Sequence, residues 1–372
     1  MNKAVELRSK ILNKVNQVVI KVGTRLLAQP EFIKELIEQI VFLRNAGKNV
    51  ILVSSGAVGT GMNILKLQKR PGRLSDIQAL AAIGQSRLMA EYEQHCRAHG
   101  FHAAQLLLTA DDLRNRERHV NIMNCINSLW AQGNLPIINE NDSVSINEIK
   151  FGDNDTLAAL AAVMTRCELT ILLTTVDGLY SVKDGRLDER ISVVEKMSDS
   201  IKANASGTDD ASMSIGGMTT KLLAAEIVAT AGQALVIADG RENNVVKRIF
   251  NCEDTGTLFM PGSKRALSAR KRWLTFFSRS AGKLFVDNGA RRALVDKGCS
   301  LLPSGIKKIE GAFNRGATVK ILDLSGVVLA KGLTNYSSDD IIKISGHKTA
   351  EINSIIGPGD EEVVHRNNMV LI

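Results

Sequence analysis

The stretch Val18-Val19-Ile20-Lys21-Val22-Gly23-Thr24 places a lysine near the end of an apolar run and a glycine directly after it. A continuous Val/Ile run of this kind predicts a strand that is buried on both faces of a parallel sheet. A lysine in such a strand is costly unless its ammonium group reaches a partner. Gly23 would let the backbone turn and approach a ligand closely. We therefore interpret Lys21 as a phosphate-binding lysine. The alternative is an edge-strand lysine that extends to water.

Further apolar runs of this kind lie in the first 250 residues, and helical patterns separate them. The runs are Val50–Val53, Gln105–Leu108, Leu135–Ile138, Leu169–Leu173 and Ala234–Ala238. Apolar residues recur at helical spacing over 32–40 and over 120–129, with Gly47 and Gly133 as stops. Strands that alternate with helices predict an α/β fold with a mostly parallel sheet. In such folds, ligands bind beyond the carboxyl ends of the strands.

A segment rich in glycine and serine, Ser54-Ser55-Gly56-Ala57-Val58-Gly59-Thr60-Gly61, directly follows the run that ends at Val53. Backbone N–H groups in such a loop can bind an anion. The segment lacks the Gly-Lys-Ser/Thr ending of a P-loop. Ordinary turns are the alternative interpretation.

Two clusters of Asn and Asp follow the run that ends at Ile138. They are Asn139-Glu140-Asn141-Asp142 and Gly152-Asp153-Asn154-Asp155-Thr156. Amide and carboxylate groups are what a site needs to hold the ammonium and carboxylate groups of an amino acid. The alternative is that Asn154 or Asp155 caps the apolar helix predicted over 157–164.

Two more segments have features of a nucleotide site. Thr174-Thr175-Val176-Asp177-Gly178-Leu179-Tyr180 lies beyond a predicted strand, and Gly216-Gly217-Met218-Thr219-Thr220-Lys221 opens a helix that runs to Gly232. We expect Thr219 or Thr220 to cap that helix. A glycine pair before a helix N-terminus suits a phosphate, because the helix dipole favours negative charge there. Lys221 opposes the same dipole, which favours an anion nearby.

The composition narrows the class of protein. The chain has 372 residues, 44% of them hydrophobic, and we see no apolar run near the roughly 18 residues of a membrane helix. We see no secretory signal either. The five cysteines form no CxxC pair, which predicts a reducing, cytoplasmic location. The histidines show no metal spacing, so we expect no metal bound by the protein alone.

The pattern changes after about residue 250. Glycines separate short strand-like runs, which predict a small, mainly β second domain. The runs are Leu284–Val286, Thr318–Leu322, Val327–Ala330 and Ile341–Ile344. Residues 262–320 carry fourteen Lys and Arg against three Asp and Glu, an excess of +11, whereas the whole chain is only +8. Such a stretch suits nucleic acid, an anionic ligand or an acidic partner, and a solvated basic surface is the alternative.

Taken in order, these motifs resemble the amino acid kinase family over nearly the whole chain. The matching segments are residues 19–24, 53–57, 82–86, 138–142, 152–155 and 216–221. The C-terminal part resembles a PUA domain, a small β module often found in RNA-modifying enzymes. Residues 289–290, 298–306 and 313–316 carry that likeness. Thr175 stands where the family usually has Asp, and Ser214-Ile215 stands where it usually has Gly-Thr.

The resemblance implies a fold and a set of domains. We expect an amino acid kinase-like three-layer αβα sandwich with a mostly parallel central sheet, followed by a small, mainly β PUA domain. The expected borders are 1–260 for the kinase domain, 261–282 for a basic linker, 283–360 for the PUA domain and 361–372 for a tail.

The resemblance also implies residue roles. Lys21 and Lys221 would neutralise the transferring phosphoryl group and the leaving oxygen, and Asp155 would orient the two lysines. Substrate would be bound by Ser55, Gly56, Asp142, Asp153 and Asn154. ATP would be contacted by Lys21, Thr174, Thr175, Ile215, Gly216, Gly217, Met218, Thr219, Thr220 and Lys221.

The implied reaction is the transfer of phosphate from ATP to the side-chain carboxylate of L-glutamate, as the first step of proline synthesis. That carboxylate is ionised at neutral pH and is itself the nucleophile, so no general base is needed. Mg²⁺ would sit mainly on the ATP phosphates. The resemblance further implies proline as a feedback inhibitor and a homo-oligomeric enzyme.

Two alternatives stay open on the sequence. Another kinase of the fold is one, although aspartokinases usually begin with Lys-Phe-Gly-Gly-Thr and uridylate kinases lack the Asn-Glu-Asn-Asp cluster. An RNA-binding or RNA-modifying protein is the other, because of the PUA likeness and the basic segment. RNA contact through the PUA domain is part of that second hypothesis.

Overall fold

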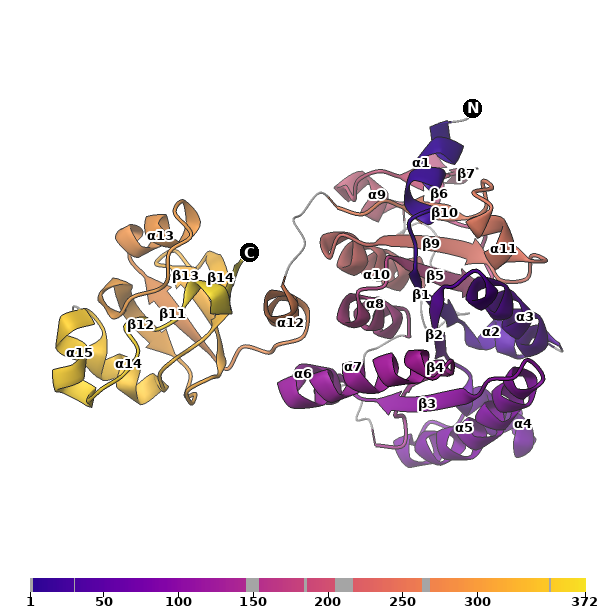
Figure 1. The fold of residues 1–372 in the computed structure, drawn as a ribbon, viewed down its shortest axis with the longest axis horizontal. Helices are drawn as coiled ribbons and strands as arrows, with labels where there is room; N and C mark the ends of the chain where they lie inside the picture. The colour runs from indigo at the N-terminus through magenta and orange to yellow at the C-terminus, as the bar shows by residue number, and fades with distance from the viewer. Residues whose placement is uncertain are drawn as a thin grey trace. The chain divides into compact units, whose positions relative to one another are not determined.

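The computed structural model describes residues 3–29, 31–144, 154–183, 186–204, 217–262, 268–347 and 349–372. The chain divides into two compact units, residues 1–266 and residues 267–372. Each unit buries its own apolar core. Figure 1 shows the elements of both units, which are described separately below.

Within its described residues, unit 1 is built on an eight-stranded sheet with the order β3-β4-β2-β1-β5-β9-β10-β8. The strands from β3 to β9 in that order are all parallel, and β10 pairs antiparallel with β9. The bounds are β1 Gln17–Val22, β2 Asn49–Ser54, β3 Ala103–Leu108, β4 Leu135–Glu140, β5 Leu169–Thr174, β8 Val193–Val194, β9 Ala234–Asp239 and β10 Thr257–Phe259. A separate antiparallel hairpin consists of β6 Tyr180–Lys183 and β7 Arg186–Arg190.

Helices cover both faces of this sheet. In Figure 1, α8 and α10 lie on one face and α3 and α11 on the other, which makes three layers. The helix bounds are α1 Lys3–Leu12, α2 Thr24–Leu27, α3 Phe32–Asn45, α4 Ala57–Ile64, α5 Leu74–Arg97, α6 Ala110–Arg114, α7 Arg116–Ala131, α8 Asn154–Thr165, α9 Asp199–Ala203, α10 Met218–Thr230 and α11 Val245–Phe250.

The predicted core of the sheet is confirmed. All six apolar runs of the first 250 residues are strands, and β1, β2, β4, β5 and β9 are buried over nearly their full length. Side chains of a strand alternate between its two faces. The even-numbered residues of β1, Val18, Ile20 and Val22, therefore pack into the same core as Ile37 and Val246 of the α3–α11 layer. The odd-numbered side chains, Lys21 among them, belong to the opposite face.

Two local predictions for unit 1 were wrong or incomplete. The helix α10 begins at Met218 with Gly217 as its N-cap, so neither Thr219 nor Thr220 caps it. Because the helix starts at the residue that directly follows the glycine pair, both threonines lie inside its first turn. The short strands β6, β7, β8 and β10 were not expected, because they are short and one of them, Arg186–Arg190, is charged and exposed.

The described part of unit 2 contains a five-stranded sheet with the order β12-β11-β13-β14-β15. Its strands are β11 Gly282–Val286, β12 Ile306–Glu310, β13 Thr318–Asp323, β14 Val328–Leu333 and β15 Met369–Leu371. Its helices are α12 Ala269–Phe276, α13 Asn288–Val295, α14 Ser338–Ile344 and α15 Thr349–Ile356. Three of the four predicted strands are present. Residues 341–344 were predicted as a strand but end helix α14, which Ser337 caps and which buries Ile341 and Ile344 at helical spacing.

The observed division lies between residues 266 and 267. The segment expected as a linker, 261–282, contributes α12, and the segment expected as a tail, 361–372, contributes β15, which pairs with β14. The three expected borders between these four segments stay predictions.

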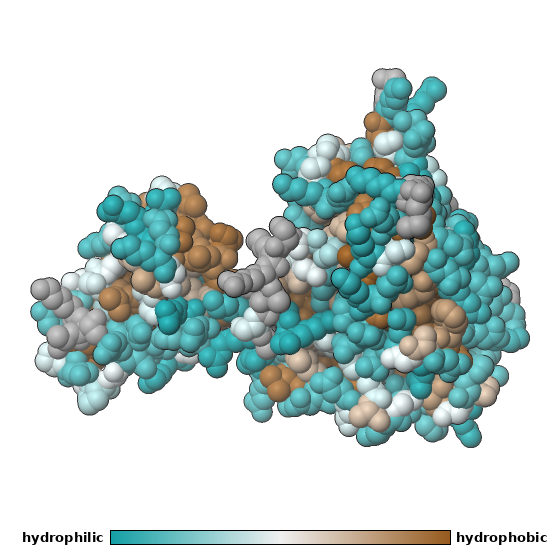
Figure 2. Space-filling view, turned by 45° about the horizontal axis from the view of Figure 1, so that its top comes forward, coloured by the Kyte–Doolittle hydropathy of each residue, from teal (hydrophilic) through white to brown (hydrophobic). Residues whose placement is uncertain are grey.

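The surface seen in Figure 2 is mostly hydrophilic, with smaller apolar patches among the polar residues. No helix in the described ranges is both long enough and apolar enough to span a bilayer.

Candidate active site

Lys21 lies in the middle of the sheet and not at an edge. Its strand β1 pairs with β2 on one side and with β5 on the other, where Lys21 stands opposite Val53 and Leu172. Only 6% of the residue is exposed. The side chain therefore does not extend to bulk water, and the edge-strand alternative from the sequence is wrong.

Two lysines from distant parts of the chain meet at one carboxylate. The Lys21 Nζ lies 2.6 Å from Asp155 Oδ1, and the Lys221 Nζ lies 3.1 Å from Asp155 Oδ2. The three residues come from β1, from the first turn of α10 and from the first turn of α8. Because the two oxygens belong to one carboxylate, both ammonium groups lie against the same side chain.

The electrostatics of this cluster favour its charged form. Asp155 is fully buried and Lys221, like Lys21, is almost so. Burial alone would raise the pKa of the Asp155 carboxyl, but the charges of Lys21 and Lys221 lower that pKa below its usual value. The carboxylate therefore stays ionised at neutral pH. One negative charge between two positive charges leaves the cluster with a net charge of +1, which favours a further anion.

The start of α10 adds hydrogen-bonding groups beside the cluster. The Thr220 hydroxyl donates to the Gly217 carbonyl oxygen at 2.9 Å and lies 3.4 Å from Asp155 Oδ2. Thr219 is exposed, whereas Met218 and Thr220 are half-buried. Within the described part of the expected nucleotide segment, 217–221, Thr220 and Lys221 thus contact Asp155.

Two of the residues expected to bind the substrate, Ser55 and Asn154, meet at the Asn154 amide. The two hydrogens of its Nδ2 are shared among three acceptors, the Ser54 carbonyl oxygen at 2.9 Å, Ser55 Oγ at 2.9 Å and Asn139 Oδ1 at 3.0 Å. Asn154 is the residue before Asp155, so the amide group and the lysine cluster belong to neighbouring positions at the start of α8. The structure thus joins the ends of β2 and β4 to the start of α8.

Gly56 and Gly61 of the 54–61 segment have different structural roles, one in a turn and the other in helix packing. Gly56 has φ +92°, a conformation that side chains rarely adopt, and it forms the turn between β2 and α4. Gly61 lies inside α4, where an added Cβ would stand 2.1 Å from the Leu80 carbonyl oxygen of α5. An added Cβ at Gly84 of α5 would likewise stand 1.9 Å from the Ala57 carbonyl oxygen of α4. The anion-loop interpretation therefore holds at most for 54–56, and the later glycines serve helix packing.

Gly23 is a different case. Its φ of −84° is open to any residue, and an added Cβ would meet the Leu173 carbonyl oxygen and the Lys21 Nζ only at 3.9 Å. Neither the backbone nor the described packing requires glycine here, so the expected backbone turn is not what it provides. Its effect is to leave space beside the Lys21 ammonium group.

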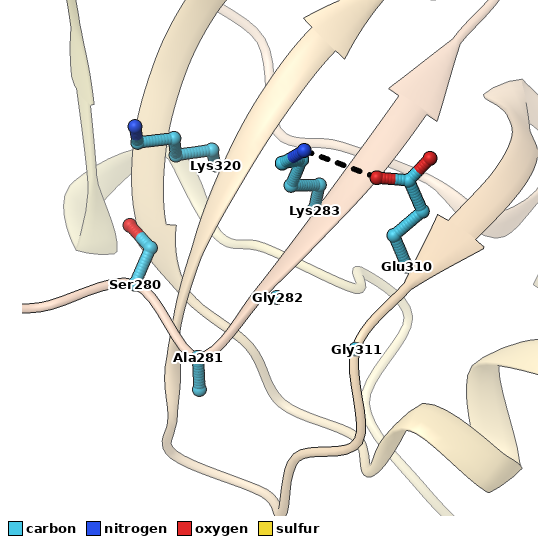
Figure 3. A pocket seen from close by; sticks show the side chains of 7 residues that line it. All are labelled: Ser280, Ala281, Gly282, Lys283, Glu310, Gly311 and Lys320. Atoms are coloured by element: carbon cyan, nitrogen blue, oxygen red, sulfur yellow. Dashed lines mark hydrogen bonds and ion pairs between the residues drawn. The ribbon is translucent and has the colours of Figure 1, made fainter.

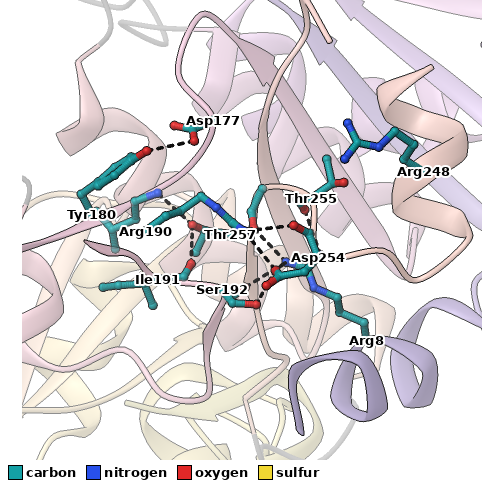
Figure 4. A network of polar contacts seen from close by, with 12 residues as sticks. Arg8, Asp177, Tyr180, Arg190, Ile191, Ser192, Arg248, Asp254, Thr255 and Thr257 are labelled. Carbon is teal, nitrogen blue, oxygen red and sulfur yellow. Dashed lines mark hydrogen bonds and ion pairs between the residues drawn. The ribbon is translucent and has the colours of Figure 1, made fainter. Parts of the chain in front are cut away.

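Thr174 and Thr175 lie at the carboxyl end of β5, next to the end of β9. The Gly240 amide donates to the Thr174 carbonyl oxygen at 2.8 Å, and Arg241 donates to the Thr175 carbonyl oxygen at 2.9 Å. The Thr257 hydroxyl forms hydrogen bonds with the segment that follows β5. That hydroxyl accepts from the Leu179 amide at 2.8 Å and donates to the Ile191 carbonyl oxygen at 2.6 Å (Figure 4). Buried Arg8 binds the neighbouring backbone at Gly256.

Some of the expected site residues are not placed together by these contacts. Asp142 is half-buried in the turn directly after β4. Asp153, Ile215 and Gly216 lie outside the described residues. Their expected roles stay predictions.

The structure adds contacts of two residues to which the sequence analysis gave no individual role. Asn139 accepts from Asn154, and Gln85 accepts from Asn139 Nδ2 at 2.9 Å. A sequence signal for Gln85 exists, because Leu80, Ala81, Gly84, Gln85 and Leu88 form the buried stripe of α5. A glutamine on such a stripe needs a polar partner.

Unit 2 carries a second group of lysines, of a different kind. Lys283, Lys320 and Lys331 stand opposite one another on β11, β13 and β14, so their side chains share one face. Lys283 pairs with Glu310 at 3.1 Å, and both line an open pocket of about 330 Å³ with Lys320 (Figure 3). Within the described residues, Lys320 contacts no carboxylate.

Comparison with known proteins agrees with this geometry. The model of the amino acid kinase family matches residues 16–239, and the model of the PUA domain matches residues 282–356. A glutamate 5-kinase of Citrifermentans bemidjiense is 42% identical over 98% of this chain and 100% of its own length. A glutamate 5-kinase of Caldanaerobacter subterraneus subsp. tengcongensis is 45% identical over 96% of this chain and 98% of its own.

A third relative, the glutamate 5-kinase of Trichlorobacter lovleyi, is 43% identical over 98% of this chain and 99% of its own. These matches cover both units, and the kinase match includes Lys21, Asn154, Asp155 and Lys221. The chain belongs to the amino acid kinase family, within its glutamate 5-kinase branch, and carries a PUA domain after the kinase domain.

Proposed function

We propose that this chain transfers the γ-phosphoryl group of ATP to the side-chain carboxylate of L-glutamate, which yields L-glutamyl 5-phosphate. The observation that carries the proposal is the meeting of the Lys21 and Lys221 ammonium groups on the buried carboxylate of Asp155. We choose glutamate among the substrates of the family because the relatives that match nearly the whole chain are glutamate 5-kinases.

The lysines supply charge stabilisation at the phosphoryl group. Phosphoryl transfer needs in-line alignment and cancellation of the charge on the transferring group and the leaving oxygen, with little covalent help from the protein. Two nearly buried ammonium groups in a low-dielectric setting are strong electrostatic partners for that charge. The space beside Lys21 that Gly23 leaves open lets a phosphate approach the ammonium group.

Asp155 acts on the lysines and not on the substrate. It holds both ammonium groups in fixed positions before ATP arrives, so that little reorganisation is needed at the moment of transfer. The side chain of glutamate is already a carboxylate at neutral pH and attacks without a general base. Ser55, Asn154 and the turn at Gly56 hold the rest of the amino acid, with Asp142 and Asp153 as further proposed contacts.

The nucleotide is proposed to lie against 217–221 and the ends of β5 and β9, with Ile215 and Gly216 completing the phosphate contacts. Mg²⁺ arrives with ATP and supplies further positive charge at its phosphates. Within the described residues, no group of three His, Cys, Asp or Glu side chains could hold a metal. Cytoplasmic location, proline inhibition, homo-oligomer formation and RNA contact through the PUA domain stay predictions.

A coupled assay of ADP release tests the proposal. Purified protein is given Mg-ATP with L-glutamate, L-aspartate or uridylate as the acceptor, with and without proline. We expect ADP release with glutamate that depends on the acceptor and yields an acyl phosphate trapped by hydroxylamine. Release of ADP with aspartate or uridylate at a higher kcat/KM than with glutamate would contradict the proposal.

A further inference from the structure

A chain of side-chain amides runs from α5 to the candidate amino-acid site. Gln85 Nε2 donates to Gln105 Oε1 at 3.1 Å, and Gln85 Oε1 accepts from Asn139 Nδ2 at 2.9 Å. Asn139 Oδ1 in turn accepts from Asn154 Nδ2 at 3.0 Å. Gln85 is 8% exposed and Asn139 is 3% exposed, so the middle of this chain is shielded from water. A buried amide network of this kind has few alternative arrangements.

Two backbone groups fix the direction of the chain. The Glu140 amide lies 2.9 Å from one atom of the Asn139 side chain, and because an N–H can only donate, that atom is the carbonyl oxygen. The Ser54 carbonyl oxygen lies 2.9 Å from the Asn154 side chain, and because it can only accept, the facing atom is the amide nitrogen. The nitrogen of Asn139 must then face Gln85, which presents its oxygen.

This direction decides what the site offers to a ligand. Both hydrogens of the Asn154 nitrogen are engaged, because they are shared among the Ser54 carbonyl oxygen, Ser55 Oγ and Asn139 Oδ1. Its carbonyl oxygen accepts from no described residue and stays available for a donor. The Ser55 hydroxyl accepts from Asn154 and keeps its own proton to donate. An acceptor and a donor side by side fit the ammonium and carboxylate groups of an amino acid.

We propose that Gln85 is a positioning residue for the amino-acid substrate, because its Oε1 anchors the Asn139 nitrogen and thereby steadies Asn139 Oδ1, one of the acceptors that hold the Asn154 amide with its carbonyl oxygen towards the substrate ammonium group. This inference rests on the proposed function. The hydrogen-bond partners of Gln85 are Gln105 and Asn139. They include neither Asp155, which pairs with the two lysines, nor the described nucleotide segment 217–221. It acts on amino-acid binding and leaves ATP binding unchanged.

The decisive variant is Gln85→Leu, which keeps an aliphatic side chain of similar size and removes the acceptor for Asn139. Asn139 Nδ2 then loses its partner, so the Asn139 side chain, although the Glu140 amide still fixes its direction, is held less firmly. Asn154 thereby loses part of the support for the orientation that favours a donor ligand. We expect the KM for glutamate to rise roughly tenfold, which is the order of one lost hydrogen bond, while the KM for ATP changes less than about twofold. The assay is the ADP-release assay with each substrate varied in turn.

Two further variants keep the test sharp. Gln39→Leu removes another buried glutamine of unit 1, whose Oε1 accepts from the Val246 amide at 2.8 Å in the α3–α11 layer. It should lower the melting temperature without changing either KM. Gln85→Glu keeps an acceptor oxygen towards Asn139 and should keep the glutamate KM within about threefold of the wild type.

The outcomes separate the inference from the proposed function. A wild-type protein that does not phosphorylate glutamate overturns the proposed function, whatever the variants do. An active wild type with an unchanged glutamate KM in Gln85→Leu, or an equal rise of both KM values, overturns the positioning role. If Gln85→Leu does not fold, Gln85→Glu decides, because a tenfold rise of the glutamate KM in that variant contradicts the need for an acceptor oxygen.

Discussion

Lys21 and Lys221 of unit 1 and Lys320 and Lys331 of unit 2 are both pairs of neighbouring cations, but their surroundings differ. The first pair is almost fully buried and shares the Asp155 carboxylate. In the second pair, Lys331 is half-buried, donates to the Ser278 carbonyl oxygen and stands opposite Lys320 across two strands. No carboxylate of the described residues lies between them.

The pKa of Lys331 shows the consequence of that difference. Burial and then the charge of Lys320 lower the pKa of Lys331 from the usual 10.5 to about 8. In unit 1, burial raises the pKa of the Asp155 carboxyl, but Lys21 and Lys221 lower that pKa below its usual value. The carboxylate therefore stays ionised between the two lysines, and unit 2 has no such group between Lys320 and Lys331 among its described residues.

The largest effect is expected from Asp155→Asn, which keeps the size of the side chain and removes its charge. Loss of one partner from a buried ion pair typically costs about 3–5 kcal/mol of stability. We expect turnover to fall by roughly a thousandfold, because the lysines lose their fixed positions. Since ATP phosphates supply the missing negative charge, ATP should raise the melting temperature of Asp155→Asn more than that of the wild type.

The matched control is Glu226→Gln, which breaks the exposed ion pair with Lys202. It should leave turnover and the melting temperature unchanged. Thermal unfolding with and without ATP, together with kcat, checks both variants. A variant Asp155→Asn with near-normal turnover would show that the lysines need no carboxylate to act.

The next largest effect is expected from Lys221→Ala. One electrostatic partner of the transferring group is lost, which typically lowers kcat by about 100- to 1000-fold. The variant also relieves Asp155 of one of its two cations, but Lys21 at 2.6 Å still pairs with it. The fold should therefore survive, which circular dichroism checks.

Lys202→Ala is the control for Lys221→Ala, because Lys202 is an exposed lysine of unit 1. It should keep full kcat. If Lys221→Ala and Lys202→Ala have the same kcat, Lys221 has no part in the phosphoryl transfer.

The sequence predicted the sheet of unit 1 well because its strands are buried on both faces. Continuous apolar runs such as Val50–Val53 and Ala234–Ala238 have few other stable arrangements in a chain of this length. The convergence of Lys21, Asp155 and Lys221 was expected from the resemblance and is seen in the contacts.

The parts that were missed depend on packing partners that a single sequence does not reveal. Gly61 was predicted to lie in an anion-binding loop, whereas the structure places it where α4 and α5 touch, opposite Gly84. Residues 341–344 have the composition of a strand, and only the cap at Ser337 and the packing of the core make them helical. The amide direction at Asn139 depends on the backbone of Glu140, which no residue pattern encodes.

The smallest effect is expected from Lys320→Glu, which places a carboxylate beside Lys331 and so gives unit 2 the arrangement of unit 1. In the wild type, unfolding lets Lys331 take up a proton between pH 8 and 10.5, because its pKa is about 8 in the folded state and higher in the unfolded state. The cost of the buried charge is therefore full below about pH 8 and disappears as the pH rises towards 10.5. Lys320→Glu should raise the pKa of Lys331 and flatten this rise of stability with pH, whereas Lys297→Glu, at an exposed lysine of the same unit, should not. An NMR titration of the Lys331 side chain measures the pKa directly. An unchanged pKa in Lys320→Glu would mean that burial alone sets it, and that the missing carboxylate is not what distinguishes the two pairs.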